Sequence, residues 1–397
     1  MLDCIFEICA AALMIVVSAG GGWAQTQPPK SLRPAAIVIT PPSRPVPIFT
    51  GDDSPHAIYE IALTNYDRRV LKIDQLALAA KPVEGCAGVS ISYQGEDLSA
   101  VFSNVSADRS KPQQPLLKPG ASATLFLMQD FSGLRCAPAT VTNSIVVESA
   151  DHSAARQLIN APETTLDHSA PIVVSAPIRG DNWWSGNGPS NFSDHRRAVV
   201  VIDGVARFAQ RYAEDWIMLD GRGHSFGGDK SRNQSYHCYG QPVLAVADGT
   251  IVEVRDGIVE NTPAPGWDPP LPPVVPIDLD TVAGNHIVEN LGGGRYALYA
   301  HLIPGSTKLR PGDKVARGAP IGKVGNSGNS TEPHLHFQIM DGPSPLGSSG
   351  VPFAIDRFIR YSYNLKYQAK DHPFAMTIGS RTAVSGQSVM NGDLGSY

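Results

Sequence analysis

Two histidines separated by one residue are the side chains of this sequence best suited to chemistry. His334 and His336 lie in the segment Glu332–Ile339. Alternate residues of an extended strand face the same side, so both imidazoles point together while Leu335 and Phe337 face the other way. One imidazole suits a borderline cation such as zinc, and its neighbour suits proton transfer. Taken alone, the pattern also fits a surface strand that happens to carry two histidines.

The composition restricts the kind of protein that can carry these histidines. The chain has 397 residues with 38 Gly, 33 Pro and 17% charged residues. This length suggests two to three domains, and the Gly and Pro content favours short strands joined by turns. The net charge of -5 and the absence of a long basic run argue against nucleic-acid binding. We therefore expect an all-β protein with no nucleic-acid partner.

The N-terminus has the pattern of an export signal. An apolar run, Ile8–Val17, is followed by small residues and Gly22-Trp23-Ala24. The run is too short to span a bilayer comfortably, and no Lys or Arg precedes it. We predict a signal peptide over residues 1–24, against an uncleaved anchor or a short apolar terminus. The mature protein is then periplasmic or secreted, with no stable membrane span.

The next segments predict a linker and a first domain. Residues 25–54 are Pro-rich and indicate an extended linker. Over residues 55–178, segments such as Ala57–Asn65 and Val70–Leu78 alternate apolar and polar residues, which predicts a β-sandwich of immunoglobulin-like type. The sandwich has no cluster of His, Cys or acidic residues, so we assign it a positioning or binding role.

The cysteines add one structural prediction. Cys86 and Cys136 fall in the predicted sandwich domain and can form a disulfide in an oxidising compartment. Cys238 is left over, and we interpret it as a small buried hydrophobe.

A second domain is expected over residues 179–360. Apolar segments at 196–202 and 205–208 flank Asp203-Gly204, a dipeptide that favours a hairpin turn. Further short strands are expected up to the His-x-His strand. Residues 361–397 are polar and contain Gly and Ser, so we expect a loosely packed C-terminal tail.

Four segments of this second domain resemble the lysostaphin or LytM type of zinc metalloendopeptidase, in the family's order. The resemblance covers roughly residues 180–345. The segments are Gln241–Gly249, Tyr299–Leu302, Pro311–Gly328 and Pro333–Phe337. Each segment alone is a weak signal, but the four in sequence are specific.

The resemblance implies a fold, a cofactor and roles for three histidines. The fold is an antiparallel β-sheet metallopeptidase domain, and the cofactor is Zn²⁺. His336 is then a zinc ligand, while His301 and His334 orient the water and stabilise the tetrahedral intermediate. The implied substrates are the stem peptides or cross-bridges of bacterial peptidoglycan.

The other two ligands are where the chain departs from the family, because its usual His-x-Gly-x-Asp motif is absent. His224 with Asp229 is one candidate pair, but its spacing is one residue too long. Asp215, which precedes an apolar segment, is the other candidate, with its histidine supplied by His195. We prefer His195, Asp215 and His336 as the metal ligands. A regular hairpin at Asp203-Gly204 would place residue 195 and Asp215 on opposite faces of the strands. A bulge or loop is therefore required to bring their side chains together.

These observations predict an exported zinc-dependent endopeptidase. The loops at 221–240 and 261–280 are expected to border its cleft. The rival, motivated by the missing motif, is a metal-free family member that acts as a scaffold or activator of another cell-wall hydrolase. A weaker alternative is a peptidase of ordinary proteins. A cell-envelope protein is a further candidate partner, and the sequence gives no oligomeric state.

Overall fold

The computed structural model describes residues 36–80, 89–103, 115–132, 137–191, 193–265, 270–367 and 374–397. The predicted signal peptide at 1–24 lies outside the described residues, as do Cys86 and Cys136 of the predicted disulfide. Within the described ranges, no helix has the length and apolar character needed to cross a membrane.

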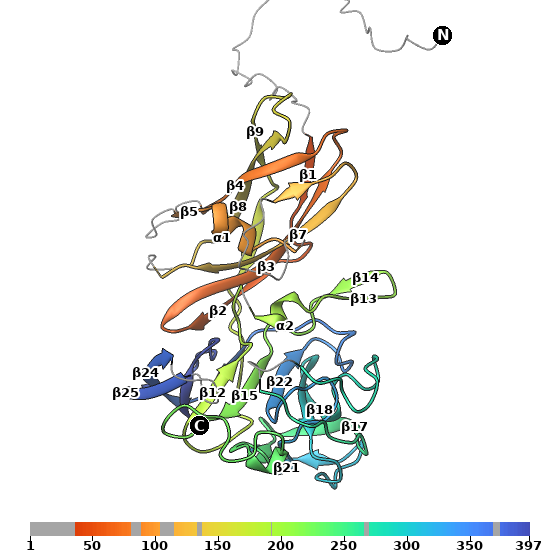
Figure 1. Ribbon diagram of the computed structural model, residues 1–397, viewed down its shortest axis with the longest axis vertical. Helices are drawn as coiled ribbons and strands as arrows, with labels where there is room; N and C mark the ends of the chain where they lie inside the picture. Colours follow the sequence, from red (N-terminus) through yellow and green to blue (C-terminus); the bar gives the residue numbers. More distant parts are fainter. Residues whose placement is uncertain are drawn as a thin grey trace, which may run out of the picture. The chain divides into compact units, whose positions relative to one another are not determined.

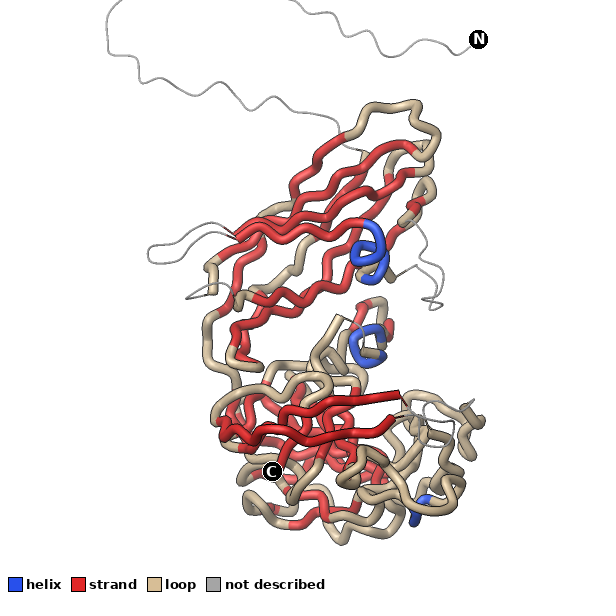
Figure 2. Tube along the Cα trace, turned by 60° about the vertical axis from the view of Figure 1, so that its left-hand side comes forward, coloured by secondary structure: helices blue, strands red, loops and turns tan. Residues whose placement is uncertain are grey.

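Strands make up most of the described chain (Figures 1 and 2). The helices of the described residues are short: α1 (Gly95–Ala100), α2 (Asp194–Arg197) and one 3-10 turn, Asn233–Ser235. The all-β prediction is confirmed.

The N-terminal strands form one 10-stranded hydrogen-bonded sheet, in which a short parallel pairing of β10 with β2 joins two halves. Side chains of both halves, such as Leu63 and Ile145, pack in one hydrophobic core. The strands are β1 (Ile37–Thr40), β2 (Val46–Gly51), β3 (Ser54–Asn65), β4 (Leu71–Ala80), β5 (Val89–Gln94), β6 (Leu116–Leu117), β7 (Ser122–Asp130), β8 (Thr140–Ser149), β9 (Gln157–Asn160) and β10 (Thr164–Asp167). The immunoglobulin-like classification stays a prediction.

The predicted linker at 25–54 is wrong from residue 37 onward, because β1 and β2 belong to this sheet. Ile37 and Ile39 are buried and alternate with exposed residues, so one face of β1 joins the core. Both strands pair with β3. Of the prolines that suggested a linker, those in the described residues fall in the turn between these strands, at Pro41, Pro42 and Pro45, and in β2, at Pro47.

The C-terminal part contains a second 10-stranded sheet, with the order β20-β17-β18-β19-β22-β15-β12-β26-β24-β25. Its described pairings are antiparallel, as the resemblance implied. Its strands are β12 (Trp183–Gly186), β15 (Glu214–Met218), β17 (Gly249–Arg255), β18 (Asn285–Gly292), β19 (Arg295–Leu302), β20 (Lys314–Val315), β22 (Leu335–Met340), β24 (Phe358–Tyr367), β25 (Phe374–Val384) and β26 (Leu394–Ser396).

Three two-stranded pairings complete the described strands. They are β11 (Ile172–Val174) with β23 (Phe353–Ile355), β13 (Val200–Ile202) with β14 (Val205–Arg207), and β16 (Pro242–Leu244) with β21 (Pro320–Lys323).

The predicted loose tail at 361–397 is wrong. Residues 358–396 supply three strands of the large sheet, and β26 lies between β12 and β24. Leu394 of β26 is fully buried. The polar residues of this segment suggested a tail. They are explained by the exposed face of the paired strands β24 and β25, since an antiparallel pair can have one face in water.

The large sheet has two different faces at its centre. Leu335, Phe337 and Ile339 of β22 pack into the main hydrophobic core of the C-terminal part. Because side chains alternate along a strand, His336 and Gln338 lie on the opposite face. The prediction that His-x-His presents its imidazoles away from the core is thereby confirmed for His336.

Replacing Leu394 by alanine tests whether β26 is an integral strand. We expect Leu394→Ala to lower the free energy of unfolding by about 2–5 kcal/mol, as for other fully buried leucines. Denaturant unfolding followed by circular dichroism measures the change. Leu365→Ala is the matched control, because Leu365 of β24 is 49% exposed. Equal small losses in both variants would show that the tail is loosely attached.

Candidate metal centre

Asp215 and His336 face each other across two neighbouring strands. They are direct partners in the antiparallel register of β15 and β22. Opposite residues of an antiparallel pair point to the same side of the sheet, so the two side chains must meet. The Nδ1 atom of His336 lies 3.1 Å from Oδ1 of Asp215. The neighbouring Trp216 and Phe337 point into the core and hold both strands in this register.

The third side chain of the group, His195, comes from the short helix α2. Its Nε2 atom lies 3.3 Å from Oδ2 of Asp215, and its ring centre lies 4.6 Å from that of His336. Ser193 caps the helix by accepting a hydrogen bond from the Arg196 backbone N–H. The predicted hairpin at Asp203-Gly204 is present as β13 and β14.

The predicted strand at 196–202 begins later than expected, because α2 occupies residues 194–197. His195 therefore does not lie on the hairpin, and the problem of a wrong strand face does not arise. The helix provides the irregular segment that the sequence analysis required.

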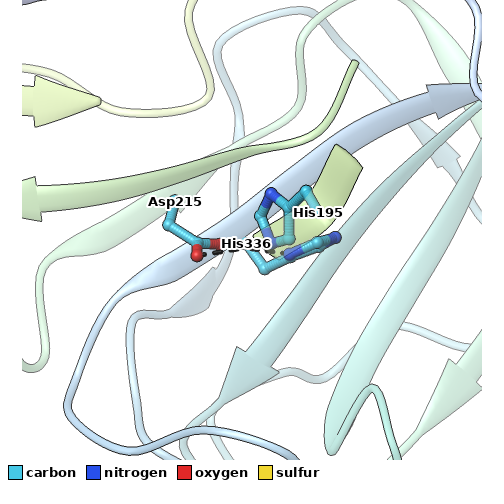
Figure 3. A group of neighbouring side chains, drawn as sticks. All are labelled: His195, Asp215 and His336. Atoms are coloured by element: carbon cyan, nitrogen blue, oxygen red, sulfur yellow. Dashed lines mark hydrogen bonds and ion pairs between the residues drawn. The ribbon is translucent and has the colours of Figure 1, made fainter. Parts of the chain in front are cut away.

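The three side chains form a donor set that fits zinc (Figure 3). One ligand atom from each of His195, Asp215 and His336 lies within 4.8 Å of the others. Ligands about 2.0–2.1 Å from a tetrahedral zinc ion lie about 3.3 Å from each other. Nε2 of His195 lies 3.3 Å from Oδ2 of Asp215, and Nδ1 of His336 lies 3.1 Å from Oδ1, so both nitrogens approach the carboxylate at about this spacing, each at a different oxygen. Two imidazoles and one carboxylate are also the ligand types that zinc accepts.

Gln338 fixes the orientation of the His336 ring. Its side-chain N–H donates to the carbonyl of Pro345 at 3.1 Å, which leaves Oε1 to face His336. The His336 Nε2 atom lies 3.0 Å from this oxygen. When Nδ1 coordinates a cation, the single N–H of the neutral ring is on Nε2 and would donate to Gln338. The Nδ1 lone pair then faces a carboxylate oxygen, an arrangement that a cation between the two stabilises.

The charges of the group support the same ligand set. Burial alone would raise the pKa of the Asp215 carboxyl, but the neighbouring imidazoles of His195 and His334 hold it well below its usual value. Burial lowers the pKa of the His195 imidazole to about 4, although the Asp215 carboxylate opposes this shift. At neutral pH the carboxylate is therefore ionised and His195 is neutral, the forms that bind metal ions.

A β-bulge turns His301 toward the group. Tyr299 of β19 packs in the main core, so His301 of a regular strand would face the core as well. The register between β18 and β19 shifts at this point, and His301 has a φ of 63°. This left-handed conformation is rare for a residue with a side chain, and such strain gathers at functional sites. The His301 ring lies 4.9 Å from that of His334 and 5.7 Å from that of His336.

Both His301 and His334 have one ring nitrogen bound to a backbone carbonyl. Nδ1 of His301 lies 2.7 Å from the carbonyl of Ser327, and Nδ1 of His334 lies 2.8 Å from that of Glu332. Each Nδ1–H therefore donates to a carbonyl, which leaves Nε2 of each ring as the atom that gains or loses a proton. Nε2 of His334 lies 3.3 Å from the Asp215 carboxylate.

The pKa values of these two histidines shift in opposite directions. Burial and the neighbouring rings of His334 and His336 lower the pKa of His301 well below its usual value. Burial also acts to lower the pKa of His334, but attraction to the Asp215 carboxylate outweighs it and raises the pKa overall. Of the two, His334 is therefore the better proton acceptor.

These residues line one cleft, and the sequence analysis missed two of its members. Asn187 donates from Nδ2 to Oδ2 of Asp215 at 2.9 Å, and Gln338 holds His336. Gln338 is two residues from His336 on the same strand, so the alternation of the strand could have revealed it. Asn187 lies eight residues before His195, outside any regular element, and no local pattern points to it. Val282 and Ala283, just beyond the predicted loop 261–280, line this cleft. Residues 223–225, from the predicted loop 221–240, line the adjoining groove.

The alternative ligands do not join the group of His195, Asp215 and His336. His224 pairs with Asp220, at 3.4 Å between Nδ1 and Oδ2. Asp229 is exposed and accepts hydrogen bonds from Ser231. The pair therefore serves local turns of the 220–235 segment.

Residues 234–347 match the family model described as "Peptidase family M23". This segment is similar to the domain of peptidase family M23. The resemblance to the lysostaphin and LytM type is thereby confirmed for this part of the chain. His301, His334 and His336 lie within the match, whereas His195 and Asp215 precede it.

Two relatives illustrate the similarity. The chain is 35% identical over 117 residues to the peptidoglycan DD-endopeptidase ShyA of Vibrio cholerae, which covers 29% of this chain and 21% of that protein. It is 39% identical over 103 residues to the glycyl-glycine endopeptidase ALE-1 of Staphylococcus capitis, which covers 25% of this chain and 22% of that protein. The chain thus spans about a fifth of the length of these curated relatives.

Among solved structures, the catalytic domain of lysostaphin from Staphylococcus simulans is 29% identical to the chain. The match covers 30% of this chain and 78% of that domain, with a TM-score of 0.18.

Gln338→Leu tests the role assigned to Gln338. Leucine has a similar size but cannot accept the His336 N–H, so we expect zinc affinity to fall by about 10–100-fold, as for other residues that orient metal ligands. Competition with a coloured chelator measures the affinity. Nitrogen NMR of the histidine side chains should show the Nε2–H form of His336 in the zinc-loaded wild type, and a larger share of other forms in the variant at the same zinc concentration. Unchanged affinity and tautomer would exclude this role.

Proposed function

We propose that the protein is a zinc-dependent endopeptidase that hydrolyses peptide bonds in peptidoglycan stem peptides or cross-bridges. The single observation that carries the proposal is the donor set of His195, Asp215 and His336, built beside two further histidines on the sheet of a domain similar to that of peptidase family M23. The family match supports peptide-bond hydrolysis as the reaction. His195 and Asp215 would supply the two metal ligands that the missing family motif usually provides.

His195, Asp215 and His336 would hold the zinc ion through Nε2, a carboxylate oxygen and Nδ1. When bound, zinc lowers the pKa of a coordinated water toward neutrality and polarises a carbonyl oxygen. Asn187 and Gln338 keep the carboxylate and the His336 ring in place. The buried position of the group excludes bulk water from one side and strengthens its electrostatic interactions.

His334 and His301 would handle the proton of the attacking water. Nε2 of His334 faces the same carboxylate as the ligands, and attraction to Asp215 raises its pKa. His334 therefore accepts the proton at Nε2 and later gives it to the leaving amine. His301 stays neutral and accepts a hydrogen bond at Nε2, which orients the water.

The substrate class rests on the relatives, two of which are named as endopeptidases, one of them of peptidoglycan. An apolar groove adjoins the metal centre, and its walls include Trp184, Leu365 and Met376. Leu365 and Met376 come from the β24–β25 hairpin, outside the family match. We assign this groove to the peptide chain next to the cleaved bond. The apolar N-terminal run supports export to the compartment where such substrates occur.

The second candidate function is a metal-free scaffold or activator of another cell-wall hydrolase. The observation that favours it is the missing His-x-Gly-x-Asp motif. The donor set that replaces the motif favours the enzyme, since a scaffold has no need for three converging ligands on three separate elements.

Metal analysis separates the two functions. We expect one zinc ion per wild-type chain, because the donor set has the composition and spacing of a tetrahedral site. His195→Ala should lose the metal and the hydrolysis of purified peptidoglycan, whereas His224→Ala should retain the metal. Elemental analysis and release of soluble peptides are the measurements. Zinc absent from the wild type would favour the scaffold, and full zinc in His195→Ala would eliminate this ligand set.

His334→Ala separates the proton acceptor from the ligands. We expect it to keep the zinc ion and to lose about 10²–10⁴-fold in kcat, the usual contribution of a general base. The pH profile of kcat should also lose its acidic limb, because protonated His334 cannot accept a proton. Loss of zinc in this variant would instead make His334 a ligand.

A further inference from the structure

We propose that the N-terminal sheet positions a ligand of the metal centre, because its residues hold the helix that carries His195. This inference rests on the proposed zinc site. It assigns Glu60 as a positioning residue, which acts on the metal through Arg196 and α2.

Arg196 joins α2 to the N-terminal sheet. It follows His195 directly, is 1% exposed, and points away from the metal group. Its guanidinium donates to the Glu60 carboxylate of β3 and to the backbone carbonyls of Tyr59 and Leu127. A planar guanidinium with several fixed acceptors defines both the position and the orientation of the backbone that carries it. His195 is therefore positioned by strands β3 and β7, which lie more than 60 residues before it in sequence.

Arg197 adds a second attachment of the same helix. Its guanidinium donates to the carbonyls of Phe102 and Ala100, and it lies 4.6 Å from the centre of the Phe126 ring. Two consecutive arginines thus attach a helix of four residues to the N-terminal sheet. So short a helix has little stability of its own, and these contacts supply it.

Glu60 also reaches the segment that precedes Asp215. Arg211 donates to the Glu60 carboxylate from Nε at 3.1 Å and from Nη2 at 2.5 Å. The next residue, Tyr212, packs edge-on against Phe49 of β2, with 5.6 Å between ring centres. The same carboxylate therefore connects the backbones that lead to two of the three metal ligands, His195 and Asp215.

The buried charges make this attachment sensitive to the loss of Glu60. Burial would raise the pKa of the Glu60 carboxyl, but Arg196 and Arg211 hold it below its usual value, so the carboxylate stays ionised. Without it, the guanidinium of Arg196 would remain in the interior with only neutral acceptors, which is unfavourable for a buried charge. The chain would relieve this by moving α2, and His195 would move with it.

The test is Glu60→Gln in the full chain, with zinc affinity measured by chelator competition and thermal unfolding recorded in parallel. We expect zinc to bind about 10–100-fold more weakly, as for other residues that support metal ligands. The visible absorption of the Co²⁺-loaded protein should also change, because its intensity reports the coordination geometry. Glu148→Gln is the matched control. Glu148 forms an ion pair with Lys72, at 3.3 Å, elsewhere in the sandwich, and this variant should retain wild-type affinity.

The outcomes separate this inference from the proposed function. A wild type without zinc affinity overturns both. Folded Glu60→Gln with wild-type affinity and absorption overturns the positioning role alone. If Glu60→Gln does not fold, Arg197→Gln is judged by the same criterion. Arg197 donates to neutral backbone carbonyls, so its substitution leaves the ion pair of Arg196 and Glu60 intact. An equal loss of affinity in Glu148→Gln would indicate general destabilisation and would also overturn the role.

Discussion

The Asp215 carboxylate is the group on which the rest of the site depends. Its contacts come from three parts of the chain: His195 from a short helix, His336 from β22 with His334 just before that strand, and Asn187 from the segment after β12. A buried carboxylate is stable only when such partners surround it. The register of β15 against β22 brings Asp215 opposite His336, and that register is fixed by the core residues on the other face. The hydrophobic core therefore determines the geometry of the polar group.

The site residues that lie on strands, Asp215 and His336, could be predicted from the sequence, because the side chains of a strand alternate between its two faces. The alternation in β22 separates His336 from Leu335 and Phe337, and the apolar residues after Asp215 mark β15 as a strand. The choice of Asp215 over Asp229 came from the same pattern. His195 was harder to place, because its position depends on contacts of α2 with strands far away in sequence. No local pattern predicts a helix of four residues attached by Arg196 and Arg197.

The errors in the fold have a common physical origin. β1 and β2 were assigned to a linker, and β24–β26 to a tail, because prolines or polar residues obscure their alternation. Each of these strands is stabilised by partners at long range: β1 by the end of β3, and β26 by β12 and β24. Composition reports local preference, and tertiary pairing overrides it. The bulge that turns His301 toward the site is likewise a property of paired strands.

The arrangement of the ligands is the central claim, and anomalous X-ray scattering at the zinc edge tests it most directly. Crystals of the full chain should show one strong zinc peak about 2.0–2.2 Å from Nε2 of His195, a carboxylate oxygen of Asp215 and Nδ1 of His336. His301 and His334 should lie beside the peak without coordinating it. A peak coordinated by His224 and Asp229, or no peak at His336 in crystals grown with zinc, would contradict the account.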